Sequence, residues 1–372
     1  MKRKRGFSTG GDDGHGTARV LPSEVARRFL AACFPRFAVD ASLTQGHFSL
    51  PTVICMSHIA TGTKNHEWAT GTFIAADERA EAYAEIERLR AGDESEALEF
   101  LEREPLKNVT LIGWINDYGL ESPQHRGEFY AHRENGRLDG LALIGHWVLM
   151  SGGERAVHAF ANAARLRHQN DVEIVLGEDF AGKMFNRLFV ALPSARVIRR
   201  IQSQYLFAIQ EVSDVKTAAE DELRVADLSE IEEVTRAHAH ACLEIHGFDK
   251  EAADPPGFRQ RTRARVEKGC VWIGRDASGV TFKCDVVINT RHAFYLEGLW
   301  TRPDMRHRGF SNRMMKALCR KLLQKRPSVC LFADANNERV TAFYRQVGFE
   351  NLASYHLTWY ESALDESGRK MQ

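Results

Sequence analysis

The stretch Leu296-Glu-Gly-Leu-Trp-Thr-Arg-Pro-Asp-Met-Arg-His-Arg-Gly-Phe-Ser311 predicts a strand, a turn rich in Arg and Gly, and the start of a helix that runs to about Lys325. The first turn of a helix has unpaired N–H groups and the positive end of the helix dipole, so this junction can bind an anion. Gly309 allows a close backbone approach, and the N–H groups from Arg306 to Asn312 can converge on a pyrophosphate. Most of the eight Lys and Arg side chains between Arg306 and Arg326 are expected to form a solvated helix face.

Gly298 lies inside the strand that precedes this turn. A glycine at such a position often marks a β-bulge or a place where a ligand comes close, and tight packing is the alternative. A bulge would part this strand from its neighbour and open a slot for a long cofactor. In a regular strand Glu297, Leu299 and Thr301 would share one face, but a bulge would change that register.

A second element follows about 25 residues later, Asn337-Glu-Arg-Val-Thr-Ala-Phe-Tyr-Arg-Gln-Val-Gly-Phe349. Asn337 and Tyr344 are seven residues apart, which places them on one stripe of a helix. A Tyr hydroxyl held near a thioester sulfur can donate its proton to a leaving thiolate. A Tyr that merely rests half-buried, with its hydroxyl in solvent, is the alternative.

Together the two elements resemble the A and B motifs of the GNAT superfamily of N-acetyltransferases, over roughly residues 222–360. Arg306-His-Arg-Gly-Phe-Ser311 matches the Arg/Gln-x-x-Gly-x-Gly/Ala loop that grips the pyrophosphate of coenzyme A through backbone amides. Asn337 and Tyr344, ahead of Gly348-Phe349, match the Asn and Tyr of the family at that spacing. The sequence departs from the motif at Ser311, which replaces the last Gly/Ala.

The resemblance implies a role for each matched residue. Tyr344 would be the general acid, and Glu297 would deprotonate the acceptor amine, often through water. The residues expected to bind acetyl-CoA are Leu299, Trp300, Thr301, Arg306, His307, Arg308, Gly309, Phe310, Ser311, Asn312 and Asn337.

Both halves of the chain show the same order of expected elements: hairpin, helix, strand, helix, strand. In the first half, Asn135-Gly136 between two strand-like runs, Gly127–Arg133 and Leu138–Met150, indicates a hairpin. This order predicts an α+β (three-layer α/β) fold with a mixed, largely antiparallel sheet flanked by helices, in two tandem domains. We expect a tail at 1–18, an N-terminal domain at 19–215, a catalytic domain at 220–362 and a tail at 363–372.

The N-terminal domain resembles a degenerate copy of the same fold. At the place of the pyrophosphate loop it has Met150-Ser-Gly-Gly-Glu-Arg155, which lacks the Arg/Gln-x-x-Gly signature, and Glu154 would oppose a phosphate. We expect this half to bind no coenzyme A productively and to shape the acceptor site instead.

Composition narrows the remaining possibilities. Equal numbers of basic and acidic residues, 50 each, give no overall attraction to nucleic acid or membrane. The seven cysteines are scattered without a CxxC, which favours free thiols in a cytoplasmic protein. No metal is expected, because His238 and His240 are two residues apart on a helix and no Cys or carboxylate completes a ligand set with His246. Gly177–Lys183 resembles a phosphate-binding loop but continues with Met184 instead of Ser or Thr.

The predicted activity is N-acetyl transfer from acetyl-CoA to a primary amine, by direct attack in a ternary complex. The amine can belong to a small molecule or to a protein lysine, and neither nucleic acid nor membrane is an expected partner. Two alternatives stay open at this point. The chain could be a non-catalytic acyl-CoA-binding regulator or scaffold, or it could transfer a larger acyl group.

Overall fold

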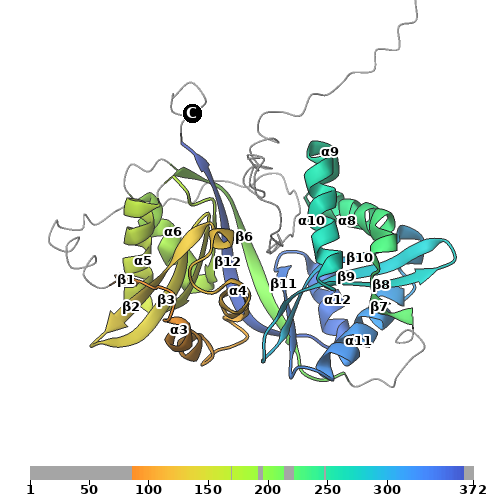
Figure 1. The fold of residues 1–372 in the computed structure, drawn as a ribbon, viewed down its shortest axis with the longest axis horizontal. Helices are drawn as coiled ribbons and strands as arrows, with labels where there is room; N and C mark the ends of the chain where they lie inside the picture. The colour runs from red at the N-terminus through yellow and green to blue at the C-terminus, as the bar shows by residue number, and fades with distance from the viewer. Residues whose placement is uncertain (1–85, 169, 192–195, 213–221, 247–248, 364–372) are drawn as a thin grey trace, which may run out of the picture. The chain divides into compact units, whose positions relative to one another are not determined.

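The computed structural model describes residues 86–363, except 169, 192–195, 213–221 and 247–248 (Figure 1). The expected tail at 1–18, the first part of the expected N-terminal domain (19–85) and all but residue 363 of the expected tail at 363–372 lie outside the described residues. We call residues 86–209 the N-terminal half and residues 224–362 the C-terminal half.

The elements of the N-terminal half are β1 (Ile86–Arg88), α3 (Glu94–Leu101), α4 (Val109–Tyr118), η1 (Pro123–His125), β2 (Gly127–Glu134), β3 (Arg137–Gly145), β4 (Trp147–Gly152), α5 (Glu154–Arg167), β5 (Ile174–Glu178), α6 (Asp179–Val190) and β6 (Arg196–Ile209). Those of the C-terminal half are β7 (Arg224–Val225), η2 (Leu228–Glu230), α8 (Ile231–His246), α9 (Lys250–Ala253), α10 (Pro255–Glu267), β8 (Val271–Asp276), β9 (Gly279–Asn289), β10 (Phe294–Thr301), η3 (Pro303–Met305), α11 (Phe310–Leu323), β11 (Val329–Asp334), α12 (Glu338–Val347) and β12 (Glu350–Ser362).

The described strands form one 12-stranded sheet in the order β1-β2-β3-β4-β5-β12-β6-β11-β10-β9-β8-β7. Neighbouring strands run antiparallel except for two parallel pairs, β4 with β5 and β10 with β11. A mixed, mostly antiparallel sheet flanked by helices is the fold class that the sequence predicts, and the structure confirms it.

The last strand of each half pairs with the other half. β6 pairs with β11 along its C-terminal part, and β12 pairs with β5 through Tyr355↔Glu178 to Trp359↔Ile174. β6 and β12 also pair with each other over most of their length, from Glu350↔Ala208 to Ser362↔Arg196. The two halves therefore exchange their terminal strands at the centre of the sheet (Figure 1).

Local sequence explains the helices next to the expected site. Met314, Ala317, Leu318 and Leu322 recur at helical spacing and bury one face of α11. α12 begins at Asn337, whose side chain accepts a hydrogen bond from the Val340 N–H at 3.1 Å. The same helix ends at Gly348, whose φ of 115° is in the left-handed region.

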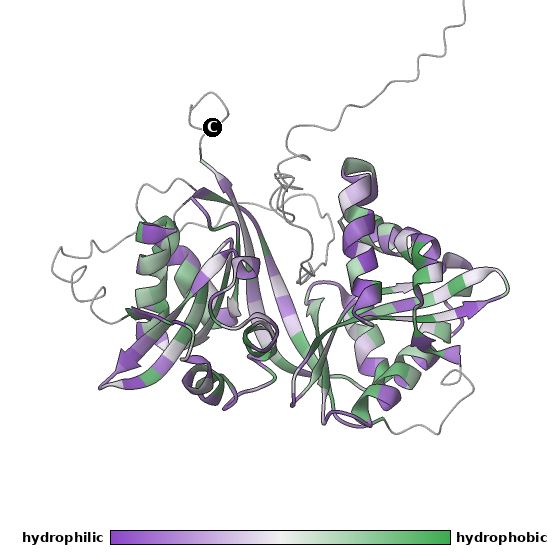
Figure 2. Cartoon of the chain, in the orientation of Figure 1, coloured by the Kyte–Doolittle hydropathy of each residue, from purple (hydrophilic) through white to green (hydrophobic). Residues whose placement is uncertain are grey.

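The strands β9 and β10 separate two apolar clusters in the C-terminal half. Phe282, Cys284 and Leu296 pack on one face with the buried residues of α11 and with Tyr344. The opposite face packs against α8 and α10 through Val271, Ile273, Val280 and Trp300. In both halves the strands carry many of the hydrophobic residues coloured green in Figure 2.

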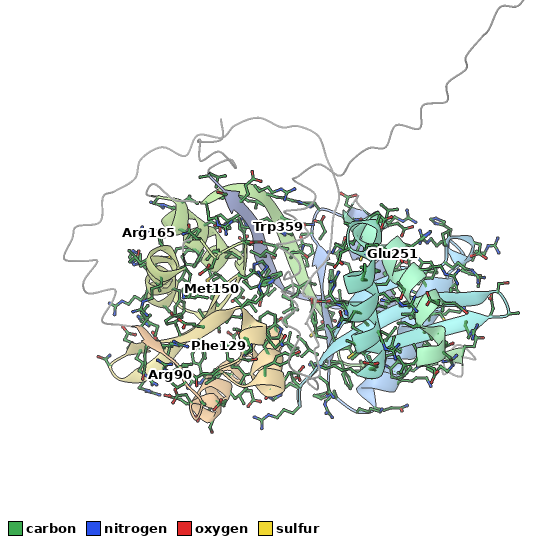
Figure 3. The ribbon with its side chains drawn as sticks, turned by 45° about the horizontal axis from the view of Figure 1, so that its top comes forward. Arg90, Phe129, Met150, Arg165, Glu251 and Trp359 are labelled. Atoms are coloured by element: carbon green, nitrogen blue, oxygen red, sulfur yellow. The ribbon has the colours of Figure 1, made fainter. Side chains whose placement is uncertain are left out.

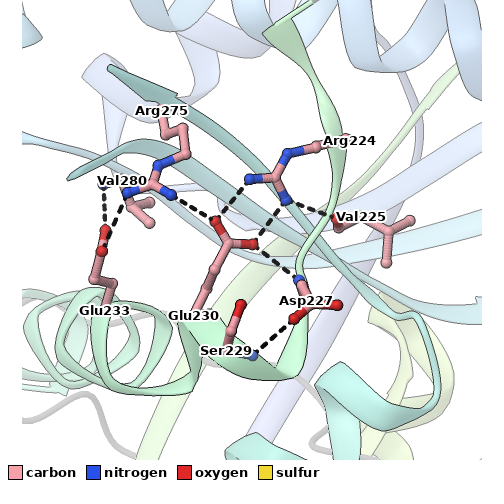
Figure 4. Close-up of polar contacts among 8 residues, drawn as sticks. All are labelled: Arg224, Val225, Asp227, Ser229, Glu230, Glu233, Arg275 and Val280. Carbon is pink, nitrogen blue, oxygen red and sulfur yellow. Dashed lines mark hydrogen bonds and ion pairs between the residues drawn. The ribbon is translucent and has the colours of Figure 1, made fainter. Parts of the chain in front are cut away.

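Ion pairs tie the start of α8 to the edge of the sheet (Figure 4). The Arg224 guanidinium donates two hydrogen bonds of 2.7 Å to Glu230, and Arg275 donates one of 3.1 Å to the same carboxylate. The hydrogen bond from Arg224 holds the pKa of Glu230 below its usual value, although burial works in the other direction. Asp227 and Glu230 complete a capping box, so this junction is fixed by side chains that are close in sequence.

Two details of the expected element order are wrong. The charged pattern from Glu78 to Arg103 predicts helical structure with a break at Ala91–Asp93. The described helix α3 does begin after that break, at Glu94, but Ile86–Arg88 before it is a strand that pairs with β2. The run Leu138–Met150 was expected as one strand, but it is divided between β3 and β4 near His146. The hairpin at Asn135-Gly136 is confirmed by the pair Glu134↔Arg137. Among the described residues, no helix is long and apolar enough to cross a membrane.

Candidate active site

A slot opens where β10 and β11 part. These parallel strands pair only at Phe294↔Val329 and Tyr295↔Cys330. Beyond Tyr295, β10 pairs only with β9, while β11 keeps its pairing with β6 through Asp334↔Gln204. The backbone of both strands on this side is therefore left for another partner, as happens where an extended ligand adds to a sheet.

The expected bulge at Gly298 is confirmed. Its φ is 58°, and the register of β10 against β9 shifts between Glu297 and Trp300. The Lys283 ammonium donates to the Gly298 carbonyl at 3.3 Å, and a Cβ at Gly298 would meet Lys283 Nζ and Asp285 Oδ2 at 3.1 Å each. A glycine is thus required here both by its backbone conformation and by the space available.

The bulge changes which side chains share a face of β10. Leu299 packs on the cluster of α11 and Trp300 on the cluster of α8, while Glu297 faces α10. Glu297 and Leu299 therefore do not share a face, as a regular strand would require. As a result, Glu297 and Tyr344 lie on opposite faces of the sheet at the slot.

The loop after β10 presents a row of backbone N–H groups. His307 and Gly309 have positive φ values, 60° and 69°. None of the backbone hydrogen bonds of the described chain uses an N–H of residues 307–312, and the helix ladder begins with the Arg313 N–H to the Gly309 carbonyl at 3.1 Å. Such a concave run of free N–H groups at a helix start is an anion site. The Arg306 N–H, which was expected to take part, is bonded to the Pro303 carbonyl at 3.2 Å.

The side chains of the loop hold it in place. Arg306 donates to both carboxylate oxygens of Glu244 at 2.9 and 3.0 Å, and to the Thr301 carbonyl at 2.7 Å. Ser311 donates to the Thr301 hydroxyl at 3.0 Å, so this departure from the family motif ties α11 to the end of β10. Phe310 is buried in the core, and the ring of His307 lies 3.2 Å from Arg339 of α12. Arg308 and Asn312 lie at the same turn, with Arg308 exposed.

Tyr344 reaches the same region from α12. Its side chain is only 5% exposed and contacts the rings of Phe207, Phe343 and Phe349 at centroid distances of 5.8, 5.2 and 5.7 Å. Burial raises the pKa of the Tyr344 hydroxyl, and the nearby thiols of Cys284 and Cys319 raise it further. The hydroxyl therefore keeps its proton at neutral pH, which a general acid requires.

Glu297 belongs to a buried cluster of charges. Its Oε2 lies 3.9 Å from Nη2 of Arg265, whose Nη1 donates to Asp285 at 2.6 Å. Asp285 also pairs with Lys283 at 2.6 Å, and neither side chain is more than 1% exposed. Burial opposes the charge of Arg265, but the carboxylates of Asp285 and Glu297 outweigh it and raise the pKa of Arg265.

Sequence reasoning missed this cluster. One signal was present, because Lys283 and Asp285 interrupt the otherwise apolar run from Val280 to Ile288 and lie two residues apart on one face of the strand. Buried charges of this kind are paired when they occur in a core. The partner from α10, Arg265, could not be identified without the tertiary structure.

The corresponding place in the N-terminal half is different. β4 and β5 also pair over a short stretch only, from Trp147↔Ile174 to Leu149↔Leu176. The Met150 side chain fills space beside Gly177, since its Cε lies 3.3 Å from where a Cβ of Gly177 would be (Figure 3). The first turn of α5 carries Glu154, and the adjacent Arg155 is paired with Glu134.

Two stretches of sequence that resemble other kinds of site, the histidines of α8 and the loop-like segment Gly177–Lys183, have structural explanations. His238 stacks on Phe258 with a centroid distance of 5.1 Å, and burial together with nearby positive charges lowers its pKa well below the usual value. In the described part of the chain, no three side chains of His, Cys, Asp or Glu are grouped as they are around a metal. Lys183 is paired with Asp179 at 2.7 Å.

Part of the chain matches a known family, and the fold is similar to that of solved structures. A family model described as "FR47-like protein" matches residues 284–359, which span most of β9 through β12. No curated protein sequence matches the chain. Among solved structures, a Drosophila protein has a TM-score of 0.51 at 11% identity, covering 74% of this chain and 98% of its own.

Two other similar structures are named for the superfamily. A GNAT-family acetyltransferase from Colwellia psychrerythraea has a TM-score of 0.47 at 10% identity, covering 74% of this chain and 99% of its own. A tandem GNAT protein from the clavulanic acid biosynthesis pathway has a TM-score of 0.45 at 13% identity, covering 76% and 99%.

The parted parallel strands, the bulge of β10 beside them and the anion loop at the start of α11 all lie within the part of the chain that the family model matches. The resemblance of the sequence to the GNAT superfamily lies in the same region, and the similarity to the solved structures is one of fold.

Proposed function

We propose that the protein is an N-acetyltransferase that uses acetyl-CoA to acetylate a primary amine. The observation that carries the proposal is the row of unbonded N–H groups at residues 307–312, which opens onto the slot between β10 and β11. An anion site at the wide end of such a slot suits a cofactor with a pyrophosphate and a long arm.

The residues present fit coenzyme A. The backbone of His307 to Asn312 would hold the pyrophosphate, and Leu299, Trp300 and Thr301 would offer their free strand edge to the arm. Asn337 would contribute by fixing the start of α12, since its side chain caps that helix. When bound, acetyl-CoA supplies an activated acyl group as a thioester.

In the proposed mechanism each catalytic residue handles one proton. Glu297, whose Oε2 lies 3.9 Å from Nη2 of Arg265, accepts a proton from the acceptor amine, directly or through water. Tyr344 approaches from the opposite face and provides the proton for the departing thiolate. We propose direct transfer in a ternary complex, and no covalent enzyme intermediate is needed.

The rest of the protein has supporting roles in this proposal. In the N-terminal half the first turn of α5 carries Glu154 in place of a basic loop, and the Met150 side chain lies beside Gly177 where β4 and β5 part. We therefore propose that this half binds no coenzyme A and shapes the acceptor site. We keep the division into domains at 19–215 and 220–362 as a proposal, with β6 and β12 exchanged between them. Free cysteines, five of them in the described residues, favour the cytoplasm.

Single substitutions distinguish this enzyme from a non-catalytic acyl-CoA-binding regulator. Glu297→Gln and Tyr344→Phe should each lower acetyl-CoA turnover, measured as free thiol against a panel of amines and peptides, by about 100-fold or more. Binding of acetyl-CoA, measured by calorimetry, should change little in both variants. Turnover that survives both substitutions would exclude the assigned acid and base, and binding without turnover in the wild type would favour the regulator.

A further inference from the structure

Tyr295 stands at the closed end of the slot. It is paired with Cys330 in the last pair that joins β10 to β11, so it is the residue after which the strands part. The side chain is 1% exposed and lies on the same face of β10 as Glu297, two residues further along.

The Tyr295 hydroxyl crosses toward β11. It forms a hydrogen bond with the backbone of Phe332, the second residue of β11 beyond the last pair. In the β11–β6 ladder, the Ala335 N–H donates to the Ser203 carbonyl. Backbone N–H groups alternate in direction along a strand, so those of Ala333 and Leu331 also point toward β6. Phe332 therefore has its N–H on the slot side, where the Tyr295 hydroxyl occupies the place of the missing strand partner.

Aromatic rings form a wall behind this hydroxyl. The ring of Tyr295 packs edge-on against Phe332 with a centroid distance of 6.0 Å, and Phe332 packs against Tyr355 at 4.8 Å. The Tyr355 hydroxyl donates to the Lys107 carbonyl at 3.0 Å, which anchors the wall on the N-terminal half. The three rings come from β10, β11 and β12 and are all buried.

The length of β10 sets how far the aromatic rings lie from the anion loop. From Thr301, next to the loop, back to Leu296, the strand extends roughly 16 Å at the usual rise per residue. A cofactor arm of similar length that begins at the loop and runs along this edge would end beside Tyr295. The acyl group is at that end of the arm, and it would meet the hydroxyl and the rings.

We propose that Tyr295 limits the length of the acyl group, so that the slot accepts acetyl and excludes chains of four or more carbons. The inference rests on the proposed function, because it assumes that the slot holds an acyl-CoA. Tyr295 acts as a specificity-determining residue here. Tyr295 closes the slot on the face of the sheet that carries Glu297, and Tyr344 lies on the opposite face.

The test compares acetyl-CoA with hexanoyl-CoA, by equilibrium binding and by turnover with one amine acceptor. Wild type should bind hexanoyl-CoA at least about tenfold more weakly, since a closed apolar pocket discriminates by this much or more for each poorly accommodated carbon. Tyr295→Ala should bind hexanoyl-CoA at least about tenfold better than wild type does. Tyr295→Phe keeps the ring and removes only the hydroxyl, so it should still discriminate against the longer chain.

Specific outcomes would overturn the inference. Wild type that binds both acyl-CoAs equally excludes a length limit, whether or not any variant folds. If Tyr295→Ala unfolds, Tyr295→Leu is a second variant that shortens the side chain but keeps more of its apolar volume. If wild type prefers acetyl-CoA and the variants Tyr295→Ala and Tyr295→Leu show the same preference, another residue limits the acyl length and the proposed function stands. If wild type binds neither acyl-CoA, the proposed function itself fails.

Discussion

At the scale of single residues, the anion loop depends on backbone conformations that side chains disfavour. Gly309 adopts a φ of 69°, and an added Cβ would meet only the end of the Arg313 side chain at 3.4 Å. The conformation, more than the space, therefore requires glycine at this position. His307 adopts a similar φ of 60° with a full side chain, so the loop already contains one residue with a disfavoured backbone.

Replacing Gly309 by Ala should weaken acetyl-CoA binding by about tenfold or more, because the loop would relax away from the conformation that points its N–H groups together. Gly136, in the β2–β3 turn, has a φ of 76° and no neighbour within 4 Å of a Cβ, which makes Gly136→Ala a matched control. Both variants should lose about 1 kcal/mol of stability in urea unfolding. Calorimetry should show weaker binding only for Gly309→Ala, and equal binding in the two variants would place the anion elsewhere.

His238 should make stability depend on pH. Burial is the main cause of its lowered pKa, and Lys283, Arg265, Lys250 and Arg261 add to it. The folded protein therefore holds His238 neutral, while the unfolded chain takes up a proton as the pH falls below about 6.5. This contribution to stability is complete above that pH and is lost as the pH falls toward the lowered pKa of the folded state.

Between pH 7.5 and 5.5 the loss from this one residue should reach at most about 1.4 kcal/mol. Urea unfolding of wild type and His238→Gln at both pH values measures it. The variant should lose less stability than wild type over this range, though some dependence will remain because burial also lowers the pKa of His125 and His356. An identical loss in the two proteins would show that His238 is not held neutral.

At the scale of elements, β9 carries the charges that fix the bulge of β10. Lys283 contacts the Gly298 carbonyl, and Asp285 links Lys283 to Arg265 of α10. Without the Asp285 carboxylate, Lys283 would lose its buried counter-charge and Arg265 would keep only Glu297, at 3.9 Å. The cluster therefore connects α10, β9 and β10 at the place where the slot opens.

Asp285→Asn should cost about 3 kcal/mol of stability or more, since the buried Lys283 loses its counter-charge and the buried Arg265 loses the nearer of its two carboxylates. Glu267→Gln is the matched control, because Glu267 forms an ion pair with Arg263 on one helix with both side chains about half exposed. That substitution should cost less than about 0.5 kcal/mol. Chemical unfolding measures both, and similar small costs would mean that the buried cluster is not ionised.

Features that depend on residues close together in the sequence could be predicted, and features that depend on distant residues could not. The anion loop and α12 follow from residues within a few positions of one another, so Gly309, Asn337 and Tyr344 could be placed from the sequence alone. The bulge could be expected from Gly298. The charged cluster that holds it could not, because Lys283, Asp285 and Arg265 come together only in the folded chain. For the same reason, neither the pairing of Arg306 with Glu244 nor the closing position of Tyr295 could be predicted.

At the scale of the whole molecule, the exchange of β6 and β12 makes the two halves depend on each other. The sequence predicted two similar halves in series, and the similar order of elements is present. The exchange could not be predicted. The alternation of apolar and polar residues in a strand shows which of its faces is buried, but it does not show which strand lies beside it in the sheet. Leu357 of β12, for example, is fully buried in a cluster that contains residues of both halves.

Residues 1–215 and 216–372 expressed separately should therefore fail to form stable monomers. The first fragment would lack β12 beside β5, and the second would lack β6 beside β11. Co-expression should give a complex whose circular dichroism and thermal transition approach those of the intact chain. Size-exclusion chromatography checks the result, and two fragments that fold cooperatively on their own would show that the exchanged strands are not essential to either half.

The exchange also has a consequence for the order of events during synthesis. β5 ends at Glu178, but the strand that covers its free edge, β12, is translated only after every other described element. The emerging N-terminal half must therefore wait with an unpaired strand edge while nearly half of the chain is made, and unpaired edges are the sites at which chains associate wrongly. We therefore expect the protein to mature slowly and to benefit from chaperones that shield this edge.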